Sequence, residues 1–236
     1  GNEHRHIVDM EGEGGWDIPE WMRKCILTTM GPLKKYKYYK LFTRPCFSSL
    51  MIDCSKDDRQ FDFPSKPGFG FRGCLNHSTR DILFKALKEP DLDNKRIRRE
   101  AYITPGWFGP APSRSEPHLI FEELMLKHPL SLCPRGAGIA STRVIETCFY
   151  GRIPVIVSDE DFYQVGEDIY DTSFMFKIIG NLSPKDMANQ LISIYNTNIG
   201  ELKDRGDAAK QYFNKVIKKY FDDPTLFFIN WLKNND

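Results

Sequence analysis

The sequence has no long hydrophobic run and almost no net charge. No stretch approaches the roughly 18 consecutive apolar residues that a transmembrane helix needs, so we expect no membrane span in this chain. Its 33 lysines and arginines nearly balance its 32 acids, which leaves a formal net charge of +1. A balance of this kind disfavours a general attraction to nucleic acid or to anionic lipid. Any anion site must therefore be local.

Cysteine pairs and metal-binding spacings are also missing. The six cysteines form no C-x-x-C pair, and no cysteine–histidine spacing suits zinc. Three of them lie in or beside apolar segments, where a free thiol packs as a small hydrophobic group: Cys74, Cys133 and Cys148. We therefore expect reduced thiols and no bound metal. The acidic pairs Asp57-Asp58 and Asp222-Asp223 are typical of a solvated linker and a helix cap.

The first ten residues, GNEHRHIVDM, do not have the pattern of a secretory signal. With no apolar span, this favours a cytoplasmic location. A luminal domain of a longer, membrane-anchored protein is the alternative, so the compartment stays open.

From Phe69 onward, strand-like and helix-like segments alternate. Ser78 is the expected N-cap of the first helix, and Ser183-Pro184 begins a later one. Uninterrupted apolar strands are typical of a parallel sheet that is covered on both faces. The fold class is therefore α/β. We expect strands at 69–73, 99–104, 130–133, 153–158 and 174–178. Helices are expected at 78–88, 116–128 and 142–150 and from 183 through 195. Another helix should end at about residue 221, and a last one should run from 223 through 231.

We divide the chain into three parts. Residues 1–62 contain strand-like runs but are few for an independent α/β domain. Residues 63–200 form a Rossmann-like domain, and residues 201–236 form helices that we expect to pack back toward the N-terminal part. The polar stretch 53–68, with its prolines and glycine, is the expected linker.

The stretch SLCPRGAGIASTRVIETCFYGRIPVIVSD, residues 131–159, carries the clearest chemistry. The strand predicted at 130–133 delivers Pro134, Arg135 and Gly136 to the sheet edge where ligands of parallel α/β folds bind. The small-residue loop that follows lets backbone amides approach an anion at the start of the next helix. Arg143 can add charge-assisted bonds to a phosphate, and Glu146, one turn inside the helix, can accept bonds from ribose hydroxyls.

Spacing alone leaves another interpretation open. Arg143 and Glu146 can form an ordinary i,i+3 ion pair, and Gly136 can simply make a turn. The segment is neither a P-loop nor the dinucleotide fingerprint, because Ser141 stands where the third glycine of the fingerprint would be.

The same stretch resembles the signature segment of the exostosin-like glycosyltransferases. That signature has a C/V-P-R-G start, a small-residue loop ending in S-x-R, a glutamate three residues later, a glycine, a V-P-V-like strand and an acid or asparagine. The segment FGFRGCLNHSTR, residues 69–80, also resembles the start of that family's C-terminal domain. The resemblance covers about residues 69–165. The positions that match the signature are Cys133, Pro134, Arg135, Gly136, Ser141, Arg143, Glu146, Gly151, Pro154, Val155 and Asp159.

The resemblance implies a GT-B architecture, in which two Rossmann-like domains face each other across a cleft, here with a shortened N-terminal domain and C-terminal helices. It implies an inverting hexosyl- or pentosyltransferase that uses a UDP-sugar as donor substrate and needs no cofactor or metal. Glu146 would bind the ribose. Arg135, Ser141, Thr142 and Arg143 would surround the diphosphate, with Gly136 in the same loop. Apart from the resemblance, Arg72 and Arg80 flank the first strand–helix loop, where either can reach the diphosphate or be ordinary surface charge. The acceptor would be an oligosaccharide or a glycoprotein glycan.

An inverting transferase also needs a general base, which in this architecture comes from the N-terminal domain. Residues 7–17 offer four acids in a glycine-rich loop, of which we favour Glu11 or Asp9. His77, a lone histidine in a polar loop, is more typical of a helix-cap neighbour than of a ligand.

Two alternatives stay open, and a third is disfavoured. A donor with another base, such as GDP, would change the specificity, and a non-catalytic module that binds nucleotide-sugars or glycans would keep the fold. A Rossmann methyltransferase is disfavoured, because Arg135 and Arg143 suit a diphosphate better than a methionine-based cofactor.

Overall fold

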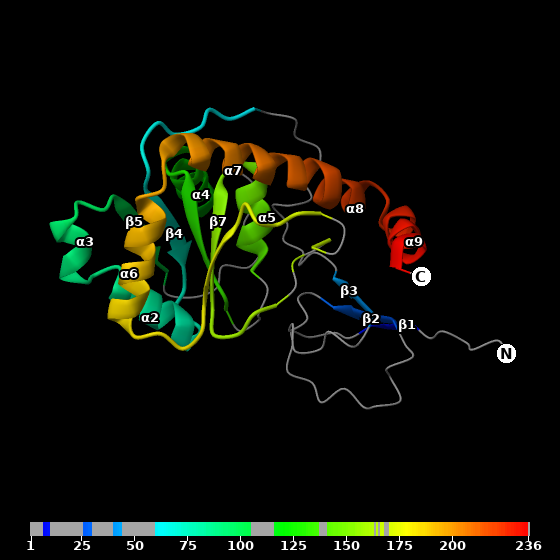
Figure 1. Cartoon of the computed structure of the whole chain (residues 1–236), viewed down its shortest axis with the longest axis horizontal. Coiled ribbons are helices and arrows are strands. Elements are labelled where there is room, and N and C mark those ends of the chain that lie inside the picture. The colour runs from blue at the N-terminus through cyan, green and yellow to red at the C-terminus, as the bar shows by residue number, and fades with distance from the viewer. Residues whose placement is uncertain are drawn as a thin grey trace.

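The computed structural model describes residues 7–9, 26–29, 40–43, 60–104, 116–136, 141–162, 164, 166–167 and 170–235. Its largest feature is a five-stranded parallel sheet with helices on both faces (Figure 1). The expected α/β architecture is therefore confirmed. In spatial order the strands are β5 (Arg99–Ile103), β4 (Phe69–Gly73), β6 (Leu130–Pro134), β7 (Ile153–Ser158) and β8 (Phe176–Ile179).

The central strands β6 and β7 are buried along their whole length. Successive side chains of a strand point to opposite faces, so each strand serves two cores. Leu130 and Leu132 pack into one core, while Cys133 packs into the other. Because helices cover both faces, both sets of side chains have to be apolar, which explains the uninterrupted apolar runs in the sequence.

One face carries α2 (Ser78–Ala86), α3 (Pro90–Asn94) and α6 (Pro184–Tyr195). Their aliphatic side chains pack with those of the strands, and Leu83 and Leu191 are almost fully buried there. The start of α6 agrees with the sequence, since the Ser183 hydroxyl accepts a hydrogen bond from the Asp186 amide at 3.2 Å. This core is mostly leucine, isoleucine and valine.

The other face carries α4 (Glu116–Lys127), α5 (Thr142–Phe149) and the C-terminal helices (Figure 1). Tyr212, Phe213 and Ile217 pack in the same core as Phe149 of α5. This core is rich in aromatic rings, and the helices that follow residue 198 are part of it. The C-terminal elements are α7 (Ile199–Tyr212), the π-helix η3 (Phe213–Ile217), α8 (Lys218–Asp222) and α9 (Pro224–Asn235).

A second, smaller parallel sheet lies in the N-terminal part of the chain. It contains β1 (Ile7–Asp9), β2 (Ile26–Thr29) and β3 (Lys40–Thr43), in that order. Parallel strands in both parts of the chain agree with an architecture of two Rossmann-like units. The division of the chain at residue 62 stays a prediction.

The end of the expected linker is bound to the sheet domain. Arg152 is 1% exposed, and its guanidinium donates to the carbonyls of Met125 at 2.5 Å and Asp62 at 2.7 Å. Phe61 packs against the Phe149 ring, with 5.6 Å between centroids. A side chain at Gly206 would clash with Phe63, because a Cβ there would lie 2.5 Å from that ring. Residues 61–63 are therefore part of the folded domain.

Two further features of the structure concern its cysteines and the apolar character of its helices. Cys74, Cys133 and Cys148 are buried free thiols, as expected. Within the part of the chain that the structure describes, no helix combines the length and the apolar character that crossing a bilayer requires.

Candidate functional site

The carboxyl ends of β4 and β6 mark the point where the sheet's connections change direction. From β4 the chain continues to β5 on one side, while β6 lies on the other side. Ligands of open α/β sheets bind at this kind of switch point. The two strands pair through Phe69–Gly70 and Leu130–Ser131, whereas β6 and β7 pair over five residues. The carboxyl-terminal halves of β4 and β6 thus lie beyond their shared ladder, and two arginines bridge them.

Arg80, from the first turn of α2, bridges the ends of both strands. Its Nε donates to the Arg135 carbonyl at 2.9 Å, and its Nη1 donates to the Cys74 carbonyl at 3.0 Å. A longer bond of 3.4 Å joins Nη2 to the Pro134 carbonyl. Burial, and then the charge of Arg143, lower the pKa of Arg80. This arginine holds the backbone at the switch point, and its positive charge remains there.

Arg143, the second residue of α5, reaches across the same gap. Its Nη2 donates to the Arg72 carbonyl of β4. Its guanidinium lies 5.2 Å from the ring centroids of both Phe71 and Phe121. Burial lowers the pKa of Arg143, and the Glu146 carboxylate opposes that shift. The side chain thus places a second cation between β4 and α5.

Arg135 directly follows β6 and pairs with Asp159, which directly follows β7. The distance from Nη1 to Oδ1 is 2.6 Å, and the two side chains are 11% and 27% exposed. The Arg135 Nε is buried and has no hydrogen-bond partner within the described residues. Burial raises the pKa of Asp159, but the hydrogen bond and charge of Arg135 outweigh it, so the pKa lies below its ordinary value. Arg135 is a third cation at this edge, and its buried Nε–H has no partner among the described residues.

Glu146 lies one turn inside α5 and is 8% exposed. A buried carboxylate is stable only beside cations or hydrogen-bond donors. Arg143 supplies that charge, because the two groups interact electrostatically. This arrangement suits either the ion pair or the ribose acceptor that the sequence left open, so the ribose role stays a prediction.

Gly136 and the start of α5 complete the edge. A Cβ at Gly136 would lie 2.9 Å from Nη2 of Arg80 and 3.4 Å from Nδ2 of Asn76, so glycine leaves both donors accessible from this backbone. Ser141 is the N-cap of α5 and has extended backbone, yet its side chain makes no capping hydrogen bond. Ser141 and Thr142 are half-buried. Residues 137–140 lie outside the described residues.

The structure brings together most of the expected donor-site residues. Arg80, Arg135, Arg143 and Gly136 surround the switch point, while Arg72 contributes at least its carbonyl. The proposed bases cannot be placed with them. Glu11 lies outside the described residues, and Asp9 is described as the last residue of β1 without its side chain.

Two more residues lie beside this edge: His77, which the sequence indicated as a neighbour of a helix cap, and Asn76, which was not singled out from the sequence. His77 is the N-cap of α2, where its Nδ1 accepts a hydrogen bond from the Thr79 amide at 3.2 Å. Its ring lies close enough to Arg135, Asp159 and Arg80 for their charges to influence its pKa. Its neighbour Asn76 lies beside Gly136. The signal that could have placed both residues at this edge was their position in the loop between β4 and α2.

Among the described residues, no group of three or more histidine, cysteine, aspartate or glutamate side chains could hold a metal ion.

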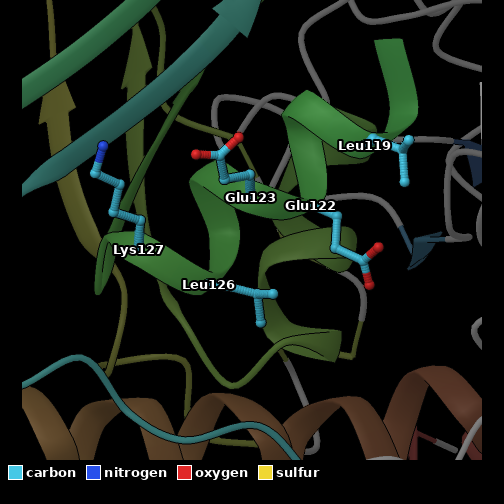
Figure 2. Close-up of a pocket in the computed structure, with 5 residues that line it drawn as sticks. All are labelled: Leu119, Glu122, Glu123, Leu126 and Lys127. Carbon is cyan, nitrogen blue, oxygen red and sulfur yellow. The ribbon is translucent and has the colours of Figure 1, made fainter. Parts of the chain in front are cut away.

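A separate surface hollow of about 460 Å³ lies along α4 and is lined by Leu119, Glu122, Glu123, Leu126 and Lys127 (Figure 2). All of these residues come from one helix, and Leu119 and Leu126 are 51% and 43% exposed. The hollow therefore lacks the convergence of polar groups from several elements that the switch point shows.

Comparisons with known proteins support the fold. No protein-family model and no curated protein matches the sequence. The crystal structure of the GtfA/B complex matches with a TM-score of 0.50 and 11% identity, covering 98% of this chain and 52% of that one. The crystal structure of TarM matches with a TM-score of 0.45 and 12% identity, covering 88% of this chain and 42% of that one.

This chain therefore spans about half the length of the solved chains it matches. The parallel α/β architecture described above is consistent with the GT-B fold of the GtfA/B glycosyltransferase. At this level of identity the similarity concerns the fold.

Proposed function

We propose that this chain binds a UDP-sugar and belongs to a glycosyltransferase that transfers the sugar, with inversion, to a carbohydrate acceptor. The observation that carries the proposal is the gathering of Arg80, Arg135 and Arg143 at the sheet's switch point, with Glu146 one turn inside α5. The GT-B-type fold and the exostosin-like signature support it from independent directions.

The three guanidinium groups suit a departing diphosphate. When the bond between the sugar and the diphosphate breaks, negative charge develops on the leaving oxygen. Fixed cations and helix-terminal amides stabilise that charge without having to reorganise. Arg135 offers a buried Nε–H that lacks a partner among the described residues, and the N-terminal amides of α5 lie beside it in the sequence. These groups can perform the neutralisation that a metal ion performs in other transferases.

The N-terminal part of the chain would supply the general base that activates the acceptor. A carboxylate there would take the proton from the acceptor hydroxyl as that oxygen attacks the anomeric carbon. Glu11 and Asp9 are the candidates. The resulting product would be a glycan extended by one sugar, with UDP as the leaving group.

Calorimetry of the chain with UDP, GDP and S-adenosylmethionine, first without metal and then with magnesium, tests the donor site. We expect selective binding of UDP without metal. Binding of none of the three, or preferential binding of S-adenosylmethionine, contradicts the proposal. Preferential binding of GDP would keep the transferase and change its donor.

The ribose contact has a sharper test. Glu146→Ala should weaken UDP binding by roughly 1–3 kcal/mol, which is about five- to 160-fold in Kd. UDP that lacks both ribose hydroxyls should bind the parent chain and Glu146→Ala equally weakly, because the lost contact is the same in both. The exposed Glu123→Ala is the matched control. A folded Glu146→Ala chain with unchanged UDP affinity would show that Glu146 only pairs with Arg143.

A further inference from the structure

The loop between β4 and α2 ends in a histidine with an unusual task. His77 has extended backbone (φ −152°, ψ 147°), and its side chain caps α2. The ring nitrogen Nδ1 accepts the Thr79 amide at 3.2 Å and lies 3.1 Å from the Thr79 hydroxyl. Serine, threonine, aspartate and asparagine are the usual residues for this role. Capping by itself therefore does not explain why a histidine is here.

The capping bond fixes where the proton of the neutral ring lies. A backbone N–H can only donate, so Nδ1 has to be the acceptor nitrogen. The proton of a neutral imidazole then resides on Nε2. Burial, and then the charge of Arg135, lower the pKa of His77, which favours this neutral form. His77 thus presents an uncharged N–H donor on the side of the ring that does not cap the helix.

The surroundings of this donor are the switch point itself. The charged groups that act on the His77 ring are Arg135 after β6, Asp159 after β7 and Arg80 on α2. The preceding residue, Asn76, has its Nδ2 3.4 Å from the point where a Gly136 Cβ would lie, and Nη2 of Arg80 lies 2.9 Å from that point. Donors from the β4–α2 loop and from α2 therefore lie beside the backbone of Gly136. Asn76 is exposed and His77 half-buried, so both are accessible to a ligand.

We propose that Asn76 and His77 are diphosphate-binding residues that donate uncharged hydrogen bonds to the phosphate oxygens of the nucleotide-sugar. The inference rests on the proposed function, and it adds binding residues from the β4–α2 loop to the proposed donor site. Arg80 donates hydrogen bonds to three backbone carbonyls, those of Cys74, Pro134 and Arg135, so Asn76 and His77 supply the direct contacts on the β4–α2 side. The β4–α2 loop would bind the diphosphate, and the uridine would be bound by residues outside this loop.

Two substitutions at His77 separate the capping role from the binding role. In His77→Asn, the amide oxygen takes the place of Nδ1 and keeps the cap, while the donor at Nε2 is lost. In His77→Gln, the longer amide brings an N–H near the position of Nε2 but caps the helix poorly. Asn76→Ala removes the other donor at an exposed position. Ser183→Ala removes a comparable cap from α6, on a helix that does not contribute to the switch point.

Calorimetry measures UDP and uridine binding for each variant, and thermal unfolding measures its stability. We expect His77→Asn to keep the parent Tm and to bind UDP about ten-fold or more weakly, because a bond to a charged phosphate is lost. Uridine affinity should not change. His77→Gln and Ser183→Ala should lower the Tm and keep most of the UDP affinity, and Asn76→Ala should lose UDP affinity alone.

The outcomes distinguish the inference from the proposed function. If the parent chain binds UDP and both His77→Asn and Asn76→Ala bind it equally well, the inference is overturned and the donor site stands. Equal losses of UDP and uridine affinity also overturn it, because they would indicate a distorted site. If the parent chain does not bind UDP, the proposed function fails, and this inference fails with it.

Discussion

Replacing Arg80 with methionine tests whether this arginine holds the strand ends of the site. Methionine keeps the aliphatic stem and removes the guanidinium that bonds to the carbonyls of Cys74 and Arg135 at 3.0 and 2.9 Å. The Pro134 carbonyl, at 3.4 Å, contributes less. Each hydrogen bond from a charged donor contributes about 1.5–3 kcal/mol, and the half-buried position reduces that value. We expect Arg80→Met to lower the free energy of unfolding by about 3 kcal/mol.

Urea unfolding followed by circular dichroism measures this change. For a chain of this size the loss corresponds to a fall in Tm of about 6–12 °C. Arg80→Lys keeps the charge but not the fork of donors, so it should recover only part of the stability. Arg98→Met is the control, since Arg98 donates one long bond of 3.4 Å at the surface. If Arg80→Met costs no more than Arg98→Met, then Arg80 does not hold the strands, and its role has to be sought in ligand binding alone.

Two further predictions concern groups buried away from the site. Burial lowers the pKa of His128 to about 4, so the unfolded chain takes up a proton near pH 6.5 while the folded chain does not. Stability is therefore complete above about pH 6.5 and should fall by about 2 kcal/mol between pH 6.5 and 5. Urea midpoints over this range should lose most of that slope in His128→Leu, and a slope identical to the parent's would contradict the assignment. Arg152→Met should lower the free energy of unfolding by about 3 kcal/mol, because the carbonyls of Met125 and Asp62 lose a buried charged donor. It should also speed proteolysis near residue 62, and unchanged urea and protease resistance would count against the contact.

Most of the sheet could be predicted because its central strands are buried on both faces. Phe69–Gly73 and Ile153–Ser158 have the expected bounds, since an apolar run between turn residues has few other interpretations. The last strand begins at Phe176, two residues later than expected. The Met175 amide bonds to the Thr172 carbonyl, which makes a turn of residues 172–175. The short helix Pro90–Asn94 was not expected, because it carries a single buried side chain, Leu92.

The start of α2 shows where local rules mislead. Ser78 has the usual chemistry of an N-cap, yet it is the first residue of the helix and His77 is the cap. The tertiary surroundings made the difference, because the ring of His77 lies among Arg80, Arg135 and Asp159. Those neighbours are far apart in the sequence and could not be seen in it.

The candidate site was predictable to the level of which residues gather. Parallel strands deliver their following residues to one edge, so Arg135 and Asp159 had to be neighbours there. Sequence could not show that Arg80 and Arg143 donate to backbone carbonyls. That depends on how far β4 and β6 separate after Gly70, which is set by packing throughout the sheet.

The docked segment 61–63 also determines where this domain can be cut from the rest of the chain. The sequence places the boundary between residues 62 and 63, inside a linker predicted to run to Gly68, so a cut could be made anywhere up to that glycine. A chain shortened to that point would leave the buried guanidinium of Arg152 without the Asp62 carbonyl and would uncover the ring faces that Phe61 and Phe63 occupy. A shortened form that keeps all of these contacts therefore has to begin before Phe61, because residues 61–63 are packed against the sheet domain.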